Sequence, residues 1–135
     1  MIRTKQDHVQ AVDTERSEHR IYAHIAWSTL GSLHIPGPRR QAIIERHLIV
    51  LCRRLDAEPI AVVAAADRVH VLLRYKPTHS LTSLVVRLKS GSRVALRTAG
   101  HGVEWASGFA AVSVGSLDVR RVMRRLASMS LQADT

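Results

Sequence analysis

Residues 60–75, IAVVAAADRVHVLLRY, are the stretch that decides the fold. An apolar run at Ile60–Ala65 is followed by Ala66-Asp67 and by a second apolar run at Val69–Tyr75. Two short apolar runs joined by a tight turn are typical of a β-hairpin. We therefore expect two antiparallel strands at the centre of the chain.

Helical patterns lie on both sides of this hairpin. Apolar residues recur at helical spacing over 39–55, which predicts an amphipathic helix before it. After it, Ser80 can cap a helix whose apolar stripe begins at Leu81 and includes Leu84 and Leu88. That helix ends before Gly100, where the pattern breaks.

Two further strands and a last helix complete the pattern. Residues 21–29 alternate as a strand does, and 109–114 form another short apolar run. Ser116 is expected to cap the last helix, with Asp118 in its first turn, where a carboxylate suits the helix dipole. The order is β-α-β-β-α-β with an additional C-terminal helix, an α+β class with a ferredoxin-like sheet. We expect residues 1–20 to form a flexible N-terminal extension and residues 21–135 to form one domain.

Composition limits the possible classes of protein. The chain has 135 residues, a formal net charge of +9 and 20 Lys plus Arg, of which 17 are Arg. A small basic domain favours a polyanionic partner such as nucleic acid, although a GC-rich genome would also enrich arginine. No apolar run is long enough for a membrane span, no secretory segment is present, and Cys52 is the only cysteine. We expect a cytoplasmic protein without a disulfide or a membrane partner.

The second hairpin strand carries half of a metal-binding pattern. Residues two apart on a strand point to the same face, so a His-x-His triplet aims two imidazoles at one cation. Here the triplet is Arg68-Val69-His70, and only His70 remains as a donor. His24, on the first predicted strand, is its nearest candidate partner.

Four segments, in order, carry a family resemblance. They are HIAWST at 24–29, DRVHVLL at 67–73, LTSLVVRLKSGSRVALR at 81–97 and WASGFAAVSVGS at 105–116. The chain resembles the single-tyrosine HUH transposases of small insertion sequences and the related REP-associated tyrosine transposases. The resemblance spans about residues 21–126. It implies the ferredoxin-like fold, DNA transposition and recombination as the family activity, and binding of single-stranded or hairpin DNA.

The resemblance also implies a catalytic set, and this chain departs from it. Active members hold Mg²⁺ or Mn²⁺ with two strand histidines and a glutamine, and a tyrosine on the last helix attacks the scissile phosphate. In this chain Arg68 stands at the first histidine position, Val122 at the tyrosine and Leu126 at the glutamine. Val, Leu and a permanently charged Arg cannot replace these groups. We therefore predict no intact catalytic residue, His70 as a residual metal ligand at most, and no cofactor.

Basic residues are the predicted DNA contacts. On the last helix, four arginines in six residues face away from an apolar stripe of Val119, Val122, Met123, Leu126 and Met129. Arginine offers a planar fork of donors that suits a phosphate. The predicted nucleic-acid contacts are Arg68, Arg87, Lys89, Arg93, Arg120, Arg121, Arg124 and Arg125. Trp27 and Trp105 are expected to pack in the interior rather than to stack on bases.

Three functions are compatible with these observations. The first is a DNA-binding member of the family that does not cleave DNA, implied by resemblance to be a homodimer. The second is an active nickase or transposase that uses Tyr22, Tyr75 or an intact partner subunit, with Mg²⁺ or Mn²⁺. The third is a protein–protein interaction module.

Overall fold

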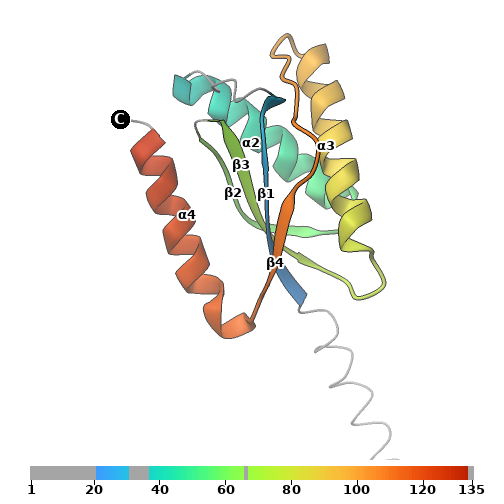
Figure 1. Cartoon of the computed structure of the whole chain (residues 1–135), viewed down its shortest axis with the longest axis vertical. Coiled ribbons are helices and arrows are strands. Elements are labelled where there is room, and N and C mark those ends of the chain that lie inside the picture. Colours follow the sequence, from blue (N-terminus) through green and yellow to red (C-terminus); the bar gives the residue numbers. More distant parts are fainter. Residues whose placement is uncertain (1–20, 31–36, 66, 134–135) are drawn as a thin grey trace, which may run out of the picture.

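The computed structural model describes residues 21–30, 37–65 and 67–133, and Figure 1 shows their arrangement. The strands are β1 (Ile21–Ser28), β2 (Glu58–Ala65), β3 (Arg68–Tyr75) and β4 (Ala110–Val114). The helices are α2 (Gly37–Arg54), α3 (Leu81–Thr98) and α4 (Val119–Ala133), with a short 3-10 helix, η3 (Ser116–Asp118), before α4. The predicted extension at residues 1–20 lies outside the described residues.

The four strands form one antiparallel sheet in the order β2-β3-β1-β4. The predicted hairpin is present, with Val63 opposite His70 and Ala65 opposite Arg68. The first strand pairs with β3, so that Ala26 lies opposite His70, and with β4, so that His24 lies opposite Val112. The predicted ferredoxin-like class with an additional C-terminal helix is confirmed.

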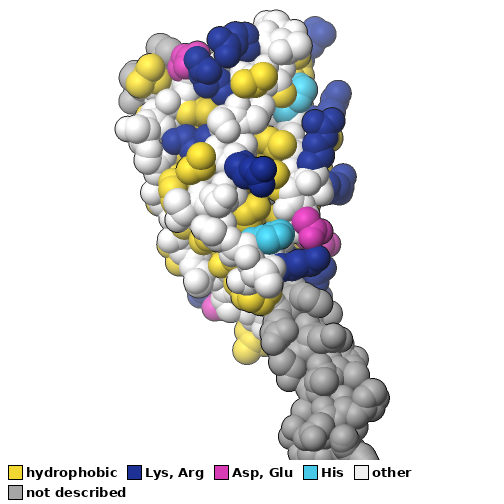
Figure 2. Space-filling view, turned by 90° about the vertical axis from the view of Figure 1, so that its right-hand side faces the viewer, with side chains coloured by type: hydrophobic (Ala, Val, Ile, Leu, Met, Phe, Trp, Pro, Cys, Tyr) yellow, Lys and Arg dark blue, Asp and Glu magenta, His cyan; other side chains and the backbone are white. Residues whose placement is uncertain are grey.

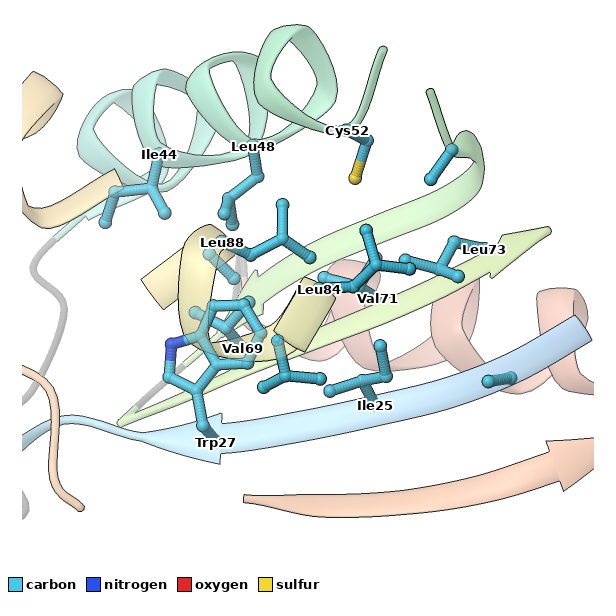
Figure 3. Close-up of a cluster of buried hydrophobic side chains, with 14 of the residues drawn as sticks. Ile25, Trp27, Ile44, Leu48, Cys52, Val69, Val71, Leu73, Leu84 and Leu88 are labelled. Carbon is cyan, nitrogen blue, oxygen red and sulfur yellow. The ribbon is translucent and has the colours of Figure 1, made fainter. Parts of the chain in front are cut away.

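Helices α2 and α3 cover one face of the sheet. Alternating strand residues, among them Ile25, Val69 and Val71, point to this face and are fully buried. They pack with Ile44 and Leu48 of α2 and with Leu84 and Leu88 of α3, and Figure 3 shows this main core. Ser80 caps α3 as predicted, because its side chain accepts a hydrogen bond from the Ser83 amide.

Helix α4 covers part of the other face. Its buried residues Val122 and Leu126 pack against Val63 and Leu72, with Val119 and Met129 at the margin, and we call this the second core. Figure 1 shows α4 on the opposite side of the sheet from α2 and α3. His24, His70 and Arg68 lie on this same face of the sheet.

Two predictions about the last helix are wrong. Ser116 does not cap it: Ser116 begins η3, whose cap position is Gly115 without a side-chain hydrogen bond, and α4 starts only at Val119. Met123 is 37% exposed and lies outside the second core. At 100° per residue, Met123 is rotated away from the line through Val122 and Leu126. Among the described helices, none has both the length and the apolar character needed to cross a bilayer.

Candidate nucleic-acid interface

Two histidines from neighbouring strands meet on the face of the sheet that α4 covers. A hydrogen bond joins Nε2 of His24 and Nδ1 of His70, 3.1 Å apart, and the two ring centroids are 5.3 Å apart. The antiparallel register produces this contact, because His24 and His70 lie on the same face at diagonal positions of β1 and β3. Such a bond requires one ring to donate and the other to accept, so neither ring needs a positive charge.

Two arginines stand near this histidine pair. Arg68 lies two residues before His70 on the same face of β3, and Arg125 approaches from α4. Burial, then His24, Arg68 and Arg125 together lower the pKa of His70 to about 4. Burial and Arg125 also lower the pKa of His24. The pair is therefore neutral at neutral pH, while the charge of the site resides on the arginines.

The donor set does not fit the divalent ion that the resemblance implies. Mg²⁺ and Mn²⁺ prefer several oxygen ligands, whereas this position offers two imidazole nitrogens that bond to each other. Within residues 21–30, 37–65 and 67–133, no group of three His, Cys, Asp or Glu side chains is placed to hold a metal ion. The cations of Arg68 and Arg125 would also repel one. The residual-ligand role of His70 stays a prediction, and we derive no step through a metal.

The positions that the resemblance assigns to tyrosine and glutamine lie in the second core. Val122 is 5% exposed and Leu126 is fully buried. Both point toward Val63 and Leu72 of the sheet rather than to solvent. The local sequence favours this packing, because apolar residues four apart on a helix share one face.

The basic residues of α4 divide into two groups. Arg120 and Arg124 are exposed on the solvent side of the helix. Arg121 and Arg125 instead line a hollow of about 170 Å³ between α4 and β4, which also includes His24 and Val112. In this hollow Arg121 Nη2 lies 3.2 Å from Asp118 Oδ1. This hollow was not foreseen, because its walls come from four separate elements, β1, β4, η3 and α4.

Lys89 and Arg93, both predicted DNA contacts, have partners within the protein. Lys89 Nζ donates to the carbonyl oxygens of Ala106, at 2.7 Å, and Gly108, at 2.8 Å. Desolvation lowers the pKa of Lys89. Arg93 Nε donates to Glu104 Oε1 at 2.8 Å, which raises the pKa of Arg93. Whether either residue also touches DNA stays a prediction.

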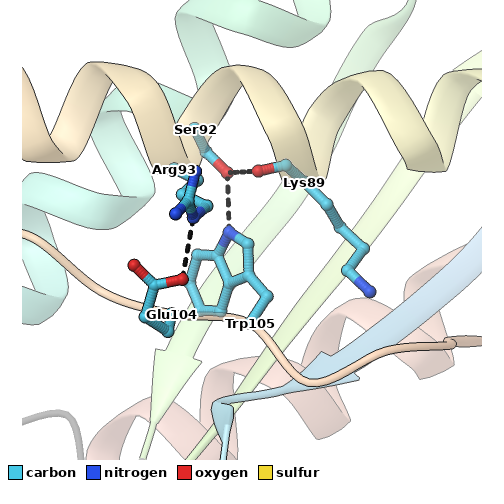
Figure 4. Close-up of polar contacts among 5 residues, drawn as sticks. All are labelled: Lys89, Ser92, Arg93, Glu104 and Trp105. Atoms are coloured by element: carbon cyan, nitrogen blue, oxygen red, sulfur yellow. Dashed lines mark hydrogen bonds and ion pairs between the residues drawn. The ribbon is translucent and has the colours of Figure 1, made fainter.

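Trp105 also joins the segment before β4 to α3. Its Nε1 donates to Ser92 Oγ at 3.1 Å, and Figure 4 shows Ser92 with Lys89, Arg93, Glu104 and Trp105. We call these five residues the loop clamp, because they fasten the segment before β4 to α3. Sequence spacing could not reveal the clamp, since the partners lie 11 to 19 residues apart.

The remaining aromatic and basic candidates are placed as follows. Trp27 is buried and packs edge to face on Trp105, with ring centroids 5.8 Å apart, so the predicted interior packing is confirmed. Tyr75 packs at the margin of the main core, and Tyr22 lies on β1 two residues before His24. Arg87 is exposed and lines a hollow of about 220 Å³ beside the start of α3.

Comparisons with known proteins agree with this architecture. The family model described as "Transposase IS200 like" matches residues 17–126. The fold is similar to a provisionally named transposase from Deinococcus radiodurans R1, with a TM-score of 0.67 and 19% identity over 82% of this chain and 91% of that one. It is also similar to a REP-associated tyrosine transposase bound to a REP hairpin, with a TM-score of 0.63 and 11% identity over 84% of this chain and 68% of that one. A search among curated protein sequences found no match.

Proposed function

The chain belongs to the family of IS200-like transposases, and we propose that it is a DNA-binding member that holds single-stranded or hairpin DNA without cutting it. We also propose that it acts in the cytoplasm. The proposal needs neither a metal nor another cofactor.

The observation that carries the proposal is the chemistry around His70. In place of a metal with a facing nucleophile, this position has a hydrogen-bonded, neutral histidine pair flanked by Arg68 and Arg125. Guanidinium groups can bind a phosphate through charged hydrogen bonds, but they provide no nucleophile for cleavage. The tyrosine position is a buried valine, so a strand held here would stay intact.

The exposed arginines of α4 supply the remaining attraction. Arg120 and Arg124 face solvent one turn apart, and Arg121 and Arg125 lie toward β4. Contacts of this kind go to phosphates and set affinity and salt dependence rather than sequence preference. Arg68 and Arg87 are further candidates of the same kind.

Two measurements test the proposal together. In a fluorescence anisotropy titration, the chain should bind a labelled hairpin with a single-stranded flank, and log K should fall linearly with log salt. After incubation with the same DNA and Mn²⁺, a denaturing gel should show no covalent protein–DNA band. A covalent band would contradict the absence of cleavage and would favour an active enzyme that uses Tyr22, Tyr75 or a partner subunit. Absence of binding even at low salt would favour a protein–protein module.

A matched pair of variants assigns the site. Arg68→Gln and Arg125→Gln remove the charges beside the histidine pair, and each should lower the salt slope by about 0.7 for single-stranded DNA. Lys76→Gln is the control, because it removes one charge at the far end of β3, where Lys76 pairs with Asp56. An equal decrease of the salt slope in all three variants would mean that DNA binding depends only on net charge.

A further inference from the structure

Helix α2 carries a charge pattern that the proposed site does not use. Basic residues occur as pairs seven residues apart: Arg39-Arg40, Arg46-His47 and Arg53-Arg54. Residues seven apart lie almost on one line along an α-helix, about 10 Å from each other. The pattern therefore forms two parallel rows of basic side chains along the whole helix.

The two rows have different surroundings. The helix buries Gln41, Ile44, Leu48 and Cys52 against the sheet. At 100° per residue, Arg39, Arg46 and Arg53 lie opposite this buried face, and all are exposed. The row of Arg40, His47 and Arg54 lies to one side, toward α3. We call the exposed row of Arg39, Arg46 and Arg53 the α2 ridge.

The α2 ridge has few acids near it: Arg53 lines a hollow with Asp56 and Glu58, and both of these acids also pair with other cations. Glu45 is the only acidic residue of α2, and its Oε2 accepts a hydrogen bond from the Ala64 amide of β2 at 2.8 Å. Asp56 and Glu58, the next acids along the chain, pair with Lys76 and Arg74. The ion pairs of Asp56, Glu58, Glu104 and Asp118 are with cations outside the α2 ridge. Its arginines are therefore available to an external anion.

A groove between α2 and α3 runs beside this ridge. It has a volume of about 510 Å³ and an apolar floor, with Arg46 and Arg54 on its rim. Gly91 allows the close approach of the two helices at this point, because a Cβ there would lie 2.6 Å from Leu51 Cδ2. Val50, in the groove, is 43% exposed. Figure 2 views the α3 side of the molecule and shows hydrophobic side chains interspersed with Lys and Arg.

We propose that the α2 ridge and the adjoining groove form a second binding surface for single-stranded DNA. The inference rests on the proposed DNA-binding function and extends it to the opposite face of the sheet. Phosphates would lie along the arginines, while bases and sugars would cover the apolar floor. A duplex presents mainly phosphates at its surface and would leave this floor uncovered, so a single strand is the better match.

The two surfaces can be reached by one strand of DNA. Helices α2 and α4 lie on opposite faces of the sheet, and both contact β2, which is an edge strand. A single strand held by Arg120 and Arg124 on α4 can therefore pass around β2 to the α2 ridge. Short strands occupy one surface, whereas long strands engage both and gain affinity from the second contact.

The test compares DNA length in matched variants. The probes are labelled oligothymidines of about 6 and about 25 nucleotides, which bracket the site sizes of single-strand-binding domains. The variant Arg46→Gln/Arg53→Gln should reduce the salt slope for the long probe by about 1.4 and its affinity near 0.1 M salt by about 25-fold. The long probe should then bind little better than the short one. Arg120→Gln/Arg124→Gln is the comparator with the same loss of charge on α4.

A second pair of variants tests the groove. Val50→Asp places a carboxylate on the groove wall and should weaken binding of the long probe at least about threefold. Val94→Asp is the matched control, because Val94 is 53% exposed on α3 and does not line the groove. Melting temperatures of the variants should match that of the wild type, since all of these positions are exposed.

The outcomes separate this inference from the proposed function. If the wild type binds the long probe and the α2 variants bind it equally well, the second surface is refuted while DNA binding stands. An equal effect of Val50→Asp and Val94→Asp refutes the role of the groove. If the wild type binds the labelled hairpin but neither oligothymidine, the second surface is refuted, and if it binds none of the three DNAs, the proposed function itself fails.

Discussion

The histidine pair shows how the surroundings of a side chain decide its chemistry. Burial, then His24, Arg68 and Arg125, make a positive charge on His70 unfavourable, and its ring instead shares a hydrogen bond with His24. The pair satisfies two polar groups that would otherwise be costly to cover with α4. The two rings are thus part of the packing beneath α4.

This pair predicts a loss of stability in mild acid. The pKa of His70 falls from 6.5 to about 4 on folding, so between these values the unfolded chain binds more protons than the folded one. The contribution of His70 to the free energy of unfolding is therefore complete above about pH 6.5 and is lost as the pH falls toward 4. Because His70 is only partly buried, we expect a loss of about 1–2 kcal/mol rather than the full value of the shift.

Urea unfolding at intervals from neutral pH to about pH 4.5 measures this loss. Down to about pH 5.5 carboxylates of ordinary pKa stay mostly ionised, so histidines dominate the change over that part of the range. His70→Gln should flatten the pH dependence of the free energy of unfolding, and His101→Gln, at a half-buried residue after the turn that follows α3, is the matched control. If the free energy of unfolding of His70→Gln changes with pH as steeply as that of the wild type, another group causes the loss of stability in acid.

Lys89 illustrates a residue whose role changes between sequence and structure. The resemblance made it a phosphate contact, but its ammonium group bonds to two carbonyl oxygens of the segment before β4. Lys89→Met keeps the length of the side chain and removes these bonds. We expect the free energy of unfolding to fall by about 1–2 kcal/mol, near the lower end for hydrogen bonds to charged groups at a partly exposed site.

The same variant should leave the salt slope of DNA binding unchanged. Arg120→Gln is the contrasting variant, with a slope reduced by about 0.7 and an unchanged free energy of unfolding. Thermal unfolding and anisotropy titrations on the same two proteins give both readouts. A stable Lys89→Met protein with a reduced slope would restore Lys89 as a phosphate contact.

At the scale of the element, α4 combines packing and charge. Its inner stripe closes the second core, and its outer face carries arginine. Leu126→Ala should cost about 2–4 kcal/mol of stability, because it opens a cavity between α4, β2 and β3. Met123→Ala, one turn away and partly exposed, should cost less than about 1 kcal/mol. Denaturant unfolding of both variants measures the difference, and equal costs would contradict the packing of α4 on its own sheet.

The periodicity of the sequence predicted the elements well where it was strong. The hairpin, α3 and its Ser80 cap follow from local signals, and all three are confirmed. The start of α4 was predicted wrongly, because Ser116 and Asp118 have the chemistry of a cap but take part in a 3-10 turn. Local chemistry alone does not distinguish these two kinds of helix start.

The candidate site was only partly predictable. His70 and Arg68 follow from strand alternation, and His24 was a candidate partner, but their contact depends on the register of β1 against β3. The loop clamp depends on contacts between α3 and a segment more than ten residues away. Such contacts between distant segments are set by tertiary packing, which one sequence does not reveal.

At the scale of the whole molecule, the two edges of the sheet are unequal. The β2 edge is irregular at Pro59–Ala61, and Glu45 accepts the hydrogen bond of its Ala64 amide. The β4 edge pairs only with β1 among the described strands, and Val112 at its centre is 63% exposed. An irregular strand whose amide is bonded to a side chain, as in β2, is protected from pairing with another strand. An exposed apolar edge, as in β4, favours such pairing.

This difference gives the implied homodimer a specific prediction. The apolar stripe of α4 packs on its own sheet, so a second copy should instead pair its β4 antiparallel to this one. Val112 is the middle residue of β4 and would then lie beside its own copy, where like charges are unfavourable. Val112→Lys should therefore convert a dimer into a monomer of 15.0 kDa, while Val94→Lys, equally charged but on α3, should leave the dimer intact. Sedimentation equilibrium measures both masses, and a wild-type chain that stays monomeric at high concentration would contradict this mode of assembly.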